Sequence, residues 1–103
     1  MTLCNDDKKH LRGIAHKLKP VVTIANKGLT DNVIAELDRA LHDHELIKVK
    51  INASNRDIKK TIIQQACSQL RAELVHTIGH VIVLYRKAEK PNLKLSNLLR
   101  NID

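Results

Sequence analysis

The chain has 103 residues, which suffices for one domain with one hydrophobic core and leaves no room for a second. Its 18 Lys and Arg residues exceed its 11 Asp and Glu residues, and the formal charge of +7 favours polyanionic partners, nucleic acid first among them. No apolar run approaches the roughly 18 residues of a membrane-spanning helix, and the polar N-terminus lacks a signal-peptide core. We therefore expect a cytoplasmic protein with no membrane partner.

Cysteines and histidines offer no pattern for a metal or catalytic site. Cys4 and Cys67 lie far apart without CxxC spacing, which argues against a disulfide framework and a zinc site. His42 and His44 would point apart on a helix, which argues against a shared metal ion. No Ser or Cys nucleophile is linked by a motif to a base, and no Walker-type phosphate loop occurs. We expect no enzyme, no cofactor, no metal and no small-molecule substrate.

The first half of the chain predicts a helix, a strand and a second helix. Apolar residues at three- and four-residue steps predict a helix over residues 6–18, ahead of Pro20. A β-branched run predicts a strand over residues 21–25. Thr30 is a good N-cap, and the apolar stripe behind it predicts a helix that ends at about His44.

Two more elements follow. In residues 46–51 apolar side chains alternate with Lys48 and Lys50, which predicts a strand with one apolar and one cationic face. Ser54 resembles the first residue of a capping box, and the apolar stripe after it predicts a helix that runs to about Ala72.

The last part of the domain predicts a hairpin, followed by a tail. Strands are predicted over residues 74–78 and 81–86, and their two-residue connection with Gly79 first favours a type II′ turn. In the tail, residues 88–103, leucines recur at helical spacing after Ser96, which is typical of a short amphipathic helix.

The element order is therefore α-β-α-β-α-β-β, with a short C-terminal helix as an addition. Alternating helices and strands favour an α/β fold in which helices pack on a sheet. We expect residues 1–87 to form one domain, a two-layer sandwich with a mixed four-stranded sheet.

The loop between the first strand and the second helix is the strongest candidate binding site. A helix start offers unpaired N–H groups and about half a positive charge, which together favour a phosphate. Asn26, Lys27, Gly28 and Thr30 lie there: Lys27 adds a cation, and Gly28 lets a nucleic-acid backbone approach closely. On spacing alone, the simpler interpretation, that Gly28 only closes a tight turn, is favoured.

Other cations are unevenly distributed along the chain. The helix predicted after Thr30 is acidic, with Arg39 as its one Lys or Arg residue, so the positive surface should be one-sided. With one Tyr and no Phe or Trp, base stacking is disfavoured, and recognition of the backbone and shape of structured RNA remains. The candidate contacts around the loop are Lys17, Lys19, Lys48, Lys50 and Arg86.

Several segments together resemble a known family. These segments are Leu11–His16, Lys19–Val22, Lys27–Thr30, His44–Lys50 and Ile78–Arg86. With them the chain resembles a bacterial stand-alone CRM domain, of the YhbY family of ribosome-associated RNA-binding proteins, in register over roughly Leu3 to Lys87.

The resemblance implies a fold similar to the C-terminal domain of bacterial translation initiation factor three. It also implies binding to the precursor of the large ribosomal subunit during assembly. The family's GxxG loop falls on residues 25–28, where Ala25 replaces the usual first glycine. We expect Ala25 to finish the strand and so to avoid a positive φ, which costs Ala roughly 1 kcal/mol or more.

Two hypotheses follow. In the first, the chain is a monomeric, non-enzymatic assembly factor that grips the backbone of structured ribosomal RNA through the loop and the surrounding cations. In the second, it is a protein-interaction module that uses the acidic helix or the leucine-rich tail, and its positive charge only maintains solubility.

Overall fold

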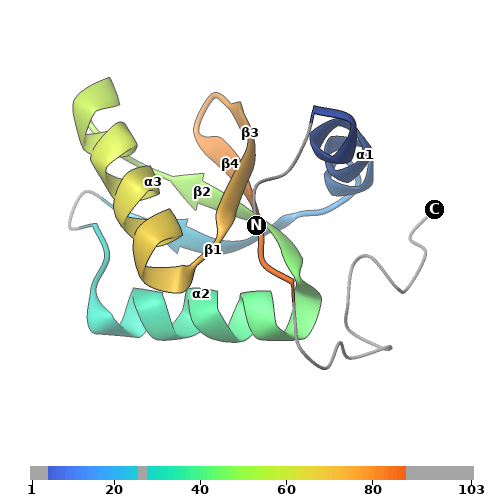
Figure 1. Cartoon of the computed structure of the whole chain (residues 1–103). Helices are drawn as coiled ribbons and strands as arrows, with labels where there is room; N and C mark the ends of the chain where they lie inside the picture. Colours follow the sequence, from blue (N-terminus) through green and yellow to red (C-terminus); the bar gives the residue numbers. More distant parts are fainter. Residues whose placement is uncertain (1–4, 26–27, 88–103) are drawn as a thin grey trace.

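The structure is a computed structural model, and it describes residues 5–25 and 28–87 (Figure 1). The predicted order of helices and strands is confirmed. In chain order the elements are α1 (Asn5–Ala15), β1 (Pro20–Ile24), α2 (Asp31–His44), β2 (Leu46–Ile51), α3 (Arg56–Leu70), β3 (Glu73–Ile78) and β4 (Val81–Tyr85). The predicted tail helix lies outside the described residues.

The four strands form one mixed sheet in the order β1-β2-β4-β3, which confirms the expected α/β class. β1 runs parallel to β2, with Val22 opposite Val49, and the crossover between them is α2. β4 is antiparallel to both of its neighbours, β2 and β3. β2 and β4 are therefore the central strands, and β3 is an edge strand.

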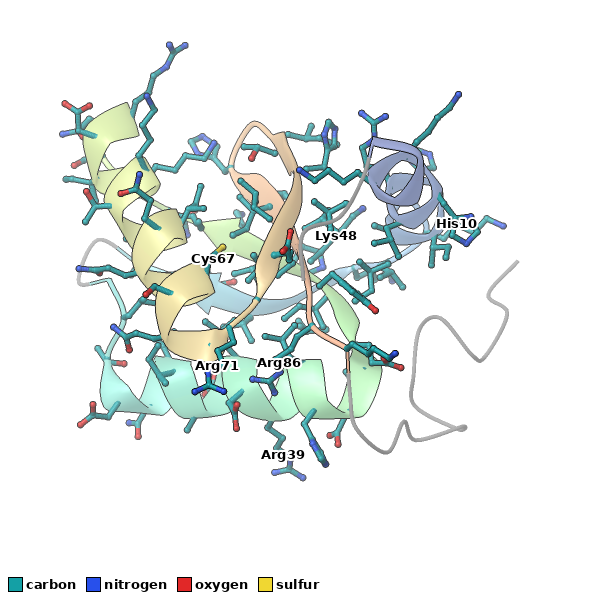
Figure 2. All side chains as sticks on the ribbon, viewed as in Figure 1. His10, Arg39, Lys48, Cys67, Arg71 and Arg86 are labelled. Carbon is teal, nitrogen blue, oxygen red and sulfur yellow. The ribbon has the colours of Figure 1, made fainter. Side chains whose placement is uncertain are left out.

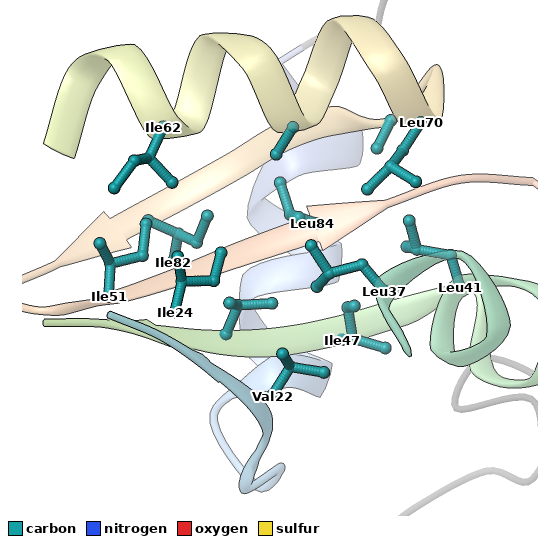
Figure 3. Packing of buried hydrophobic residues seen from close by; sticks show 13 residues of the cluster. Val22, Ile24, Leu37, Leu41, Ile47, Ile51, Ile62, Leu70, Ile82 and Leu84 are labelled. Atoms are coloured by element: carbon teal, nitrogen blue, oxygen red, sulfur yellow. The ribbon is translucent and has the colours of Figure 1, made fainter. Parts of the chain in front are cut away.

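The main hydrophobic core lies between the sheet and the two helices α2 and α3 (Figure 3). Alternate residues of β2 and β4 point into it, as the period of two in a strand requires. The helices contribute side chains at three- and four-residue steps, which form one stripe on each helix. Its largest fully buried members include Leu37, Leu41, Ile47, Ile51, Ile82 and Leu84.

A smaller core lies on the other face of the sheet, beneath α1. Leu11 and Ala15 of α1 pack there against Leu46, Val75 and Val83, which alternate along the strands with residues of the main core. α1 therefore adds a partial third layer to the two layers that the sequence predicts. Much of this second face carries exposed side chains, among them Val21 and Thr23 of β1.

Helices α1 and α3 differ in their bounds from the sequence-based expectation. α1 ends at Ala15 rather than at residue 18, because the next turn tightens: the Leu18 N–H donates to the Ala15 carbonyl at 2.9 Å. α3 is capped by Asn55 rather than by Ser54, since the Asn55 side-chain oxygen accepts from the Ile58 N–H at 2.9 Å. It ends at Leu70, ahead of Arg71 in the left-handed conformation.

The β3–β4 hairpin has the expected two-residue connection. Ile78 pairs with Val81, Gly79 has φ +55°, and His80 has no positive φ. A positive φ at the first loop residue alone is the pattern of a type II′ turn, as the sequence predicts.

No helix among the described residues is long and apolar enough to cross a bilayer.

Candidate nucleic-acid interface

The loop after β1 is closed by a backbone turn. The Gly28 N–H donates to the Ala25 carbonyl at 2.9 Å, and Gly28 has φ +76°. Glycine is the residue that adopts such a φ without strain, so it is favoured at this position. The two residues between, Asn26 and Lys27, lie outside the described residues, and their contacts stay a prediction from the sequence.

Ala25 keeps a conformation that suits a residue with a side chain. Among the described residues other than glycine, a positive φ occurs at Glu45 and Arg71, and not at Ala25. The expectation that Ala25 avoids a positive φ is therefore confirmed, although β1 ends at Ile24, one residue earlier than predicted. Replacement of the family's first glycine thus costs the turn little strain.

The start of α2 is accessible, as an anion-binding helix start must be. Thr30 is the predicted N-cap: its hydroxyl accepts from the Val33 N–H at 3.2 Å. Thr30 and the next two residues, Asp31 and Asn32, are exposed. The carboxylate of Asp31 lies in the same turn and offsets part of the helix dipole, so lysine side chains must supply most of the attraction for a phosphate.

Two predicted lysines lie next to β1 on the second face of the sheet. In the strand register Lys48 is opposite Pro20, and Lys50 is opposite Thr23 near the loop. Figure 2 shows Lys48 on the side of the sheet next to α1. Lys50 is exposed and Lys48 is half-buried, so both ammonium groups can reach a ligand on this face.

Lys17 and Lys19 are exposed at the other end of β1. A five-residue strand spans roughly 16 Å, so these lysines do not lie at the loop itself. They begin a row of cations that continues along β1 and β2 toward Gly28. We call this row the lysine track, and its members are Lys17, Lys19, Lys48 and Lys50.

The carboxylates of α2 are separated from the lysine track. Residues 8–30 and 46–56, which include every lysine of the track, contain no Asp or Glu. The acidic side chains of α2, such as Asp31 and Glu36, belong to a helix that packs on the opposite face of the sheet. The lysine track therefore lies apart from the most acidic helix of the domain, as a polyanion-binding face requires.

Arg86 does not join the lysine track, and we remove it from the predicted contacts. Its guanidinium pairs with the Asp38 carboxylate at 2.7 Å and donates to the carbonyl oxygens of Asp38 at 2.9 Å and Leu70 at 3.1 Å. Figure 2 shows it beside α2, on the acidic side of the domain. Arg86 thus ties β4 to α2 and α3, and its side chain is 21% exposed.

We expect the Arg86→Ala variant to lose stability and to keep its RNA affinity. Charge-assisted hydrogen bonds contribute roughly 1.5–3 kcal/mol each, and the exposed Asp38 carboxylate weakens its share, so the free energy of unfolding should fall by about 2 kcal/mol. Urea unfolding checks this, with Lys87→Ala as a control that removes one exposed cation. A stable Arg86→Ala variant that binds RNA more weakly than Lys87→Ala would restore Arg86 to the interface.

Three loops meet at the end of the sheet that carries Gly28. The Asn52 N–H donates to the Ile24 carbonyl at 2.8 Å, which joins the β2–α3 turn to the end of β1. On its other side this turn meets the hairpin tip, because the Ile51 N–H donates to the His80 carbonyl. A methyl group on Gly28 would lie 3.8 Å from Ile62 of α3. The loop, the turn and the tip therefore form one continuous end of the domain.

The sequence-based search missed the cations of α3. Arg56, Lys59 and Lys60 lie at this same end of the domain, on the side of α3 that faces the hairpin tip. Their spacing of three and four residues places them on one helix face, and that spacing was the available signal. In the sequence it could not be told apart from an ordinary solvated helix face.

Neither a metal site nor a reactive thiol is found in the described part of the chain. No group of three His, Cys, Asp or Glu side chains in residues 8–25 and 28–87 is arranged to hold a metal ion. Burial, and to a lesser degree the Glu73 carboxylate, raises the pKa of the Cys67 thiol. A raised pKa keeps this thiol protonated and unreactive at neutral pH.

Comparison with known proteins identifies the family of the chain. Residues 3–86 match the CRS1 / YhbY (CRM) domain. The chain belongs to this family. A CRM-domain relative from Pseudomonas aeruginosa, named "Probable RNA-binding protein", is 48% identical over 100 residues, which cover 97% of this chain and 96% of the relative. A Haemophilus influenzae protein named "RNA-binding protein" is 45% identical over 94 residues, or 91% and 95% of the two chains.

A solved structure has the same fold as this CRM domain. The solution structure of a hypothetical protein from Staphylococcus aureus superposes with a TM-score of 0.76 at 36% identity. The match covers 86% of this chain and 93% of the other. The mixed sheet with its three helices is therefore shared with this solved structure.

Proposed function

We propose that this CRM domain is a monomeric, non-enzymatic protein that binds structured RNA by its phosphate backbone. The RNA is ribosomal RNA of the large-subunit precursor, and binding takes place in the cytoplasm during subunit assembly. The names of the two bacterial relatives support RNA as the partner. The ribosomal target rests on the resemblance to the YhbY family.

The separation of charge across the sheet is the observation that carries this proposal. Lys48 and Lys50 lie on the face that is opposite α2, and the start of α2 with its exposed Thr30 stands at the end of their strand pair. Phosphates of one RNA segment can therefore contact the lysine track and the loop together. The carboxylates of α2 keep that helix away from the RNA.

Backbone contacts are favoured over base readout on the sheet. The chain has one Tyr and no Phe or Trp, and Tyr85 is partly buried against the core beneath α1. Proteins that bind single-stranded nucleic acid on the surface of a β-sheet present exposed aromatic rings to the bases. The exposed face of this sheet presents lysines instead. Lys48 and Lys50 act as mobile point charges that follow the phosphates of a folded RNA.

A salt titration tests the proposal. Binding of the whole chain to a folded fragment of large-subunit ribosomal RNA is measured by fluorescence anisotropy at several salt concentrations. If about five phosphates are neutralised, log Kobs should fall against log salt with a slope of about −4. Weak binding that does not depend on salt contradicts the proposal and supports a protein-interaction module instead.

Sedimentation tests the ribosomal target. Cell extract is separated on a sucrose gradient, and the protein is located by antibody in wild-type cells and in cells that carry Lys27→Ala. We expect the wild-type protein to travel with large-subunit precursors and the variant to shift toward the top. Wild-type protein that stays at the top of the gradient contradicts a ribosomal role.

A further inference from the structure

A groove lies between α3 and the β3–β4 hairpin, apart from the lysine track. Its volume is about 830 Å³, within the usual range for sites that enclose a small ligand. Its apolar lining comes from Ala53, Ile63 and Leu74. Lys59 crosses one end of it, where its ammonium group donates a hydrogen bond to the Gly79 carbonyl and ties α3 to the hairpin tip.

The charged residues that line the groove are cations, and Ser54, Asn55, Gln64 and Thr77 add neutral polar groups. Arg56, Lys59 and Lys60 of α3 line it together with His80 of the hairpin, and no Asp or Glu does. Asp57 lies in the same turn of α3 but does not line the groove. An apolar lining bordered by cations complements a ligand that has a flat apolar part and a phosphate.

The groove opens at the same end of the domain as the loop. His80 accepts a backbone hydrogen bond from Ile51, and the residue after Ile51 is bonded to the end of β1. The groove and the Gly28 turn are thus separated by the short β2–α3 connection. An RNA held at the loop can therefore place its next nucleotides in the groove.

We propose that the groove binds one unpaired nucleotide of the RNA, which makes the domain selective for RNA with a bulge or a loop. This inference rests on the proposed function. The base lies on Ile63 and Leu74, and the Arg56 guanidinium or the His80 ring stacks on its exposed face, as such groups do on unstacked bases. Lys60 contacts the adjoining phosphate.

Two RNA hairpins that differ by one bulged nucleotide test the proposal. Affinity is measured for wild-type protein, for Arg56→Gln/Lys60→Gln, and for Arg39→Gln/Lys87→Gln, which removes two exposed cations elsewhere. We expect wild-type protein to prefer the bulged hairpin roughly tenfold, and the Arg56/Lys60 variant to lose that preference. The control variant should keep it. Lys59 is left unchanged because it holds the groove together.

Methyl NMR of the whole chain provides a second readout. The bulged hairpin should shift the methyl signals of Ile63 and Leu74, whereas the fully paired hairpin should not. Equal shifts with both hairpins would contradict nucleotide binding in the groove, and so would equal loss of affinity in the two double variants. Neither result would contradict RNA binding by the domain. If free adenosine monophosphate binds the groove as tightly as the bulged hairpin does, the ligand of the groove is a free nucleotide and the proposal is wrong. Absence of binding to either hairpin contradicts the proposed function itself.

Discussion

Replacing both Lys48 and Lys50 with Gln should weaken binding to structured RNA by a factor on the order of 30 near 0.1 M salt. Each phosphate contact contributes about 0.9 to the slope of log Kobs against log salt, so two lost contacts also make that slope less steep by about 2. Both lysines lie on the acid-free face of β2, beside β1 and its loop. Fluorescence anisotropy over a salt series measures both changes.

The Arg39→Gln/Lys87→Gln variant is the matched control for this effect. It removes the same charge from exposed positions outside the lysine track, and the pair between Arg39 and Asp43, at 3.9 Å on the surface, contributes little. The control should lose affinity less than about threefold, through the net charge alone. Equal losses in the two variants would show that the RNA responds to total charge and that the lysine track is not a site.

The Leu84→Ala variant should lose about 2–5 kcal/mol of unfolding free energy, the largest effect on stability that we expect from a single substitution. Leu84 is 0% exposed on the central strand β4, and it faces the core between α2 and α3 (Figure 3). Ala leaves a cavity that the surrounding isoleucines and leucines cannot fill. Because small domains are stable by only about 5–15 kcal/mol, the melting temperature should fall steeply.

Ile78→Ala is the control for this substitution. Ile78 lies in the same sheet but is 58% exposed, so its truncation should change the unfolding free energy by less than about 0.5 kcal/mol. Urea unfolding of both variants gives the comparison. A Leu84→Ala variant as stable as Ile78→Ala would mean that α2 and α3 do not pack on β4 as described.

Local patterns explain why the helices and strands could be predicted. In β2 the alternation of apolar residues with Lys48 and Lys50 places the strand at Leu46–Ile51, as the structure has it. Thr30 gives α2 its start because a hydroxyl cap and the helix it caps are neighbours in sequence. The sequence pattern places the cap of α3 one residue too early, since Ser54 and Asn55 are both capping residues and the pattern cannot choose between them.

The candidate site was only partly predictable for a different reason. Lys48 and Lys50 share a face through the period of the strand alone, so their common exposure follows from the sequence. In the sequence, Arg86 cannot be distinguished from any other cation at the end of a strand. Its partners Asp38 and Leu70 are 48 and 16 residues away, and a contact of that kind leaves no periodic signal.

The class of the fold and the order of its elements follow from the sequence, because each depends on residues close together in the chain, and the excess of positive charge follows from the composition. Where that charge acts depends on the tertiary packing. Packing of α2 on the face opposite Lys48 and Lys50 separates the lysine track from the carboxylates of α2, and it pairs Arg86 with Asp38. Packing of α3 beside the hairpin tip forms a groove with cationic side chains. These outcomes depend on contacts between distant segments, whose geometry is set by how the whole core packs.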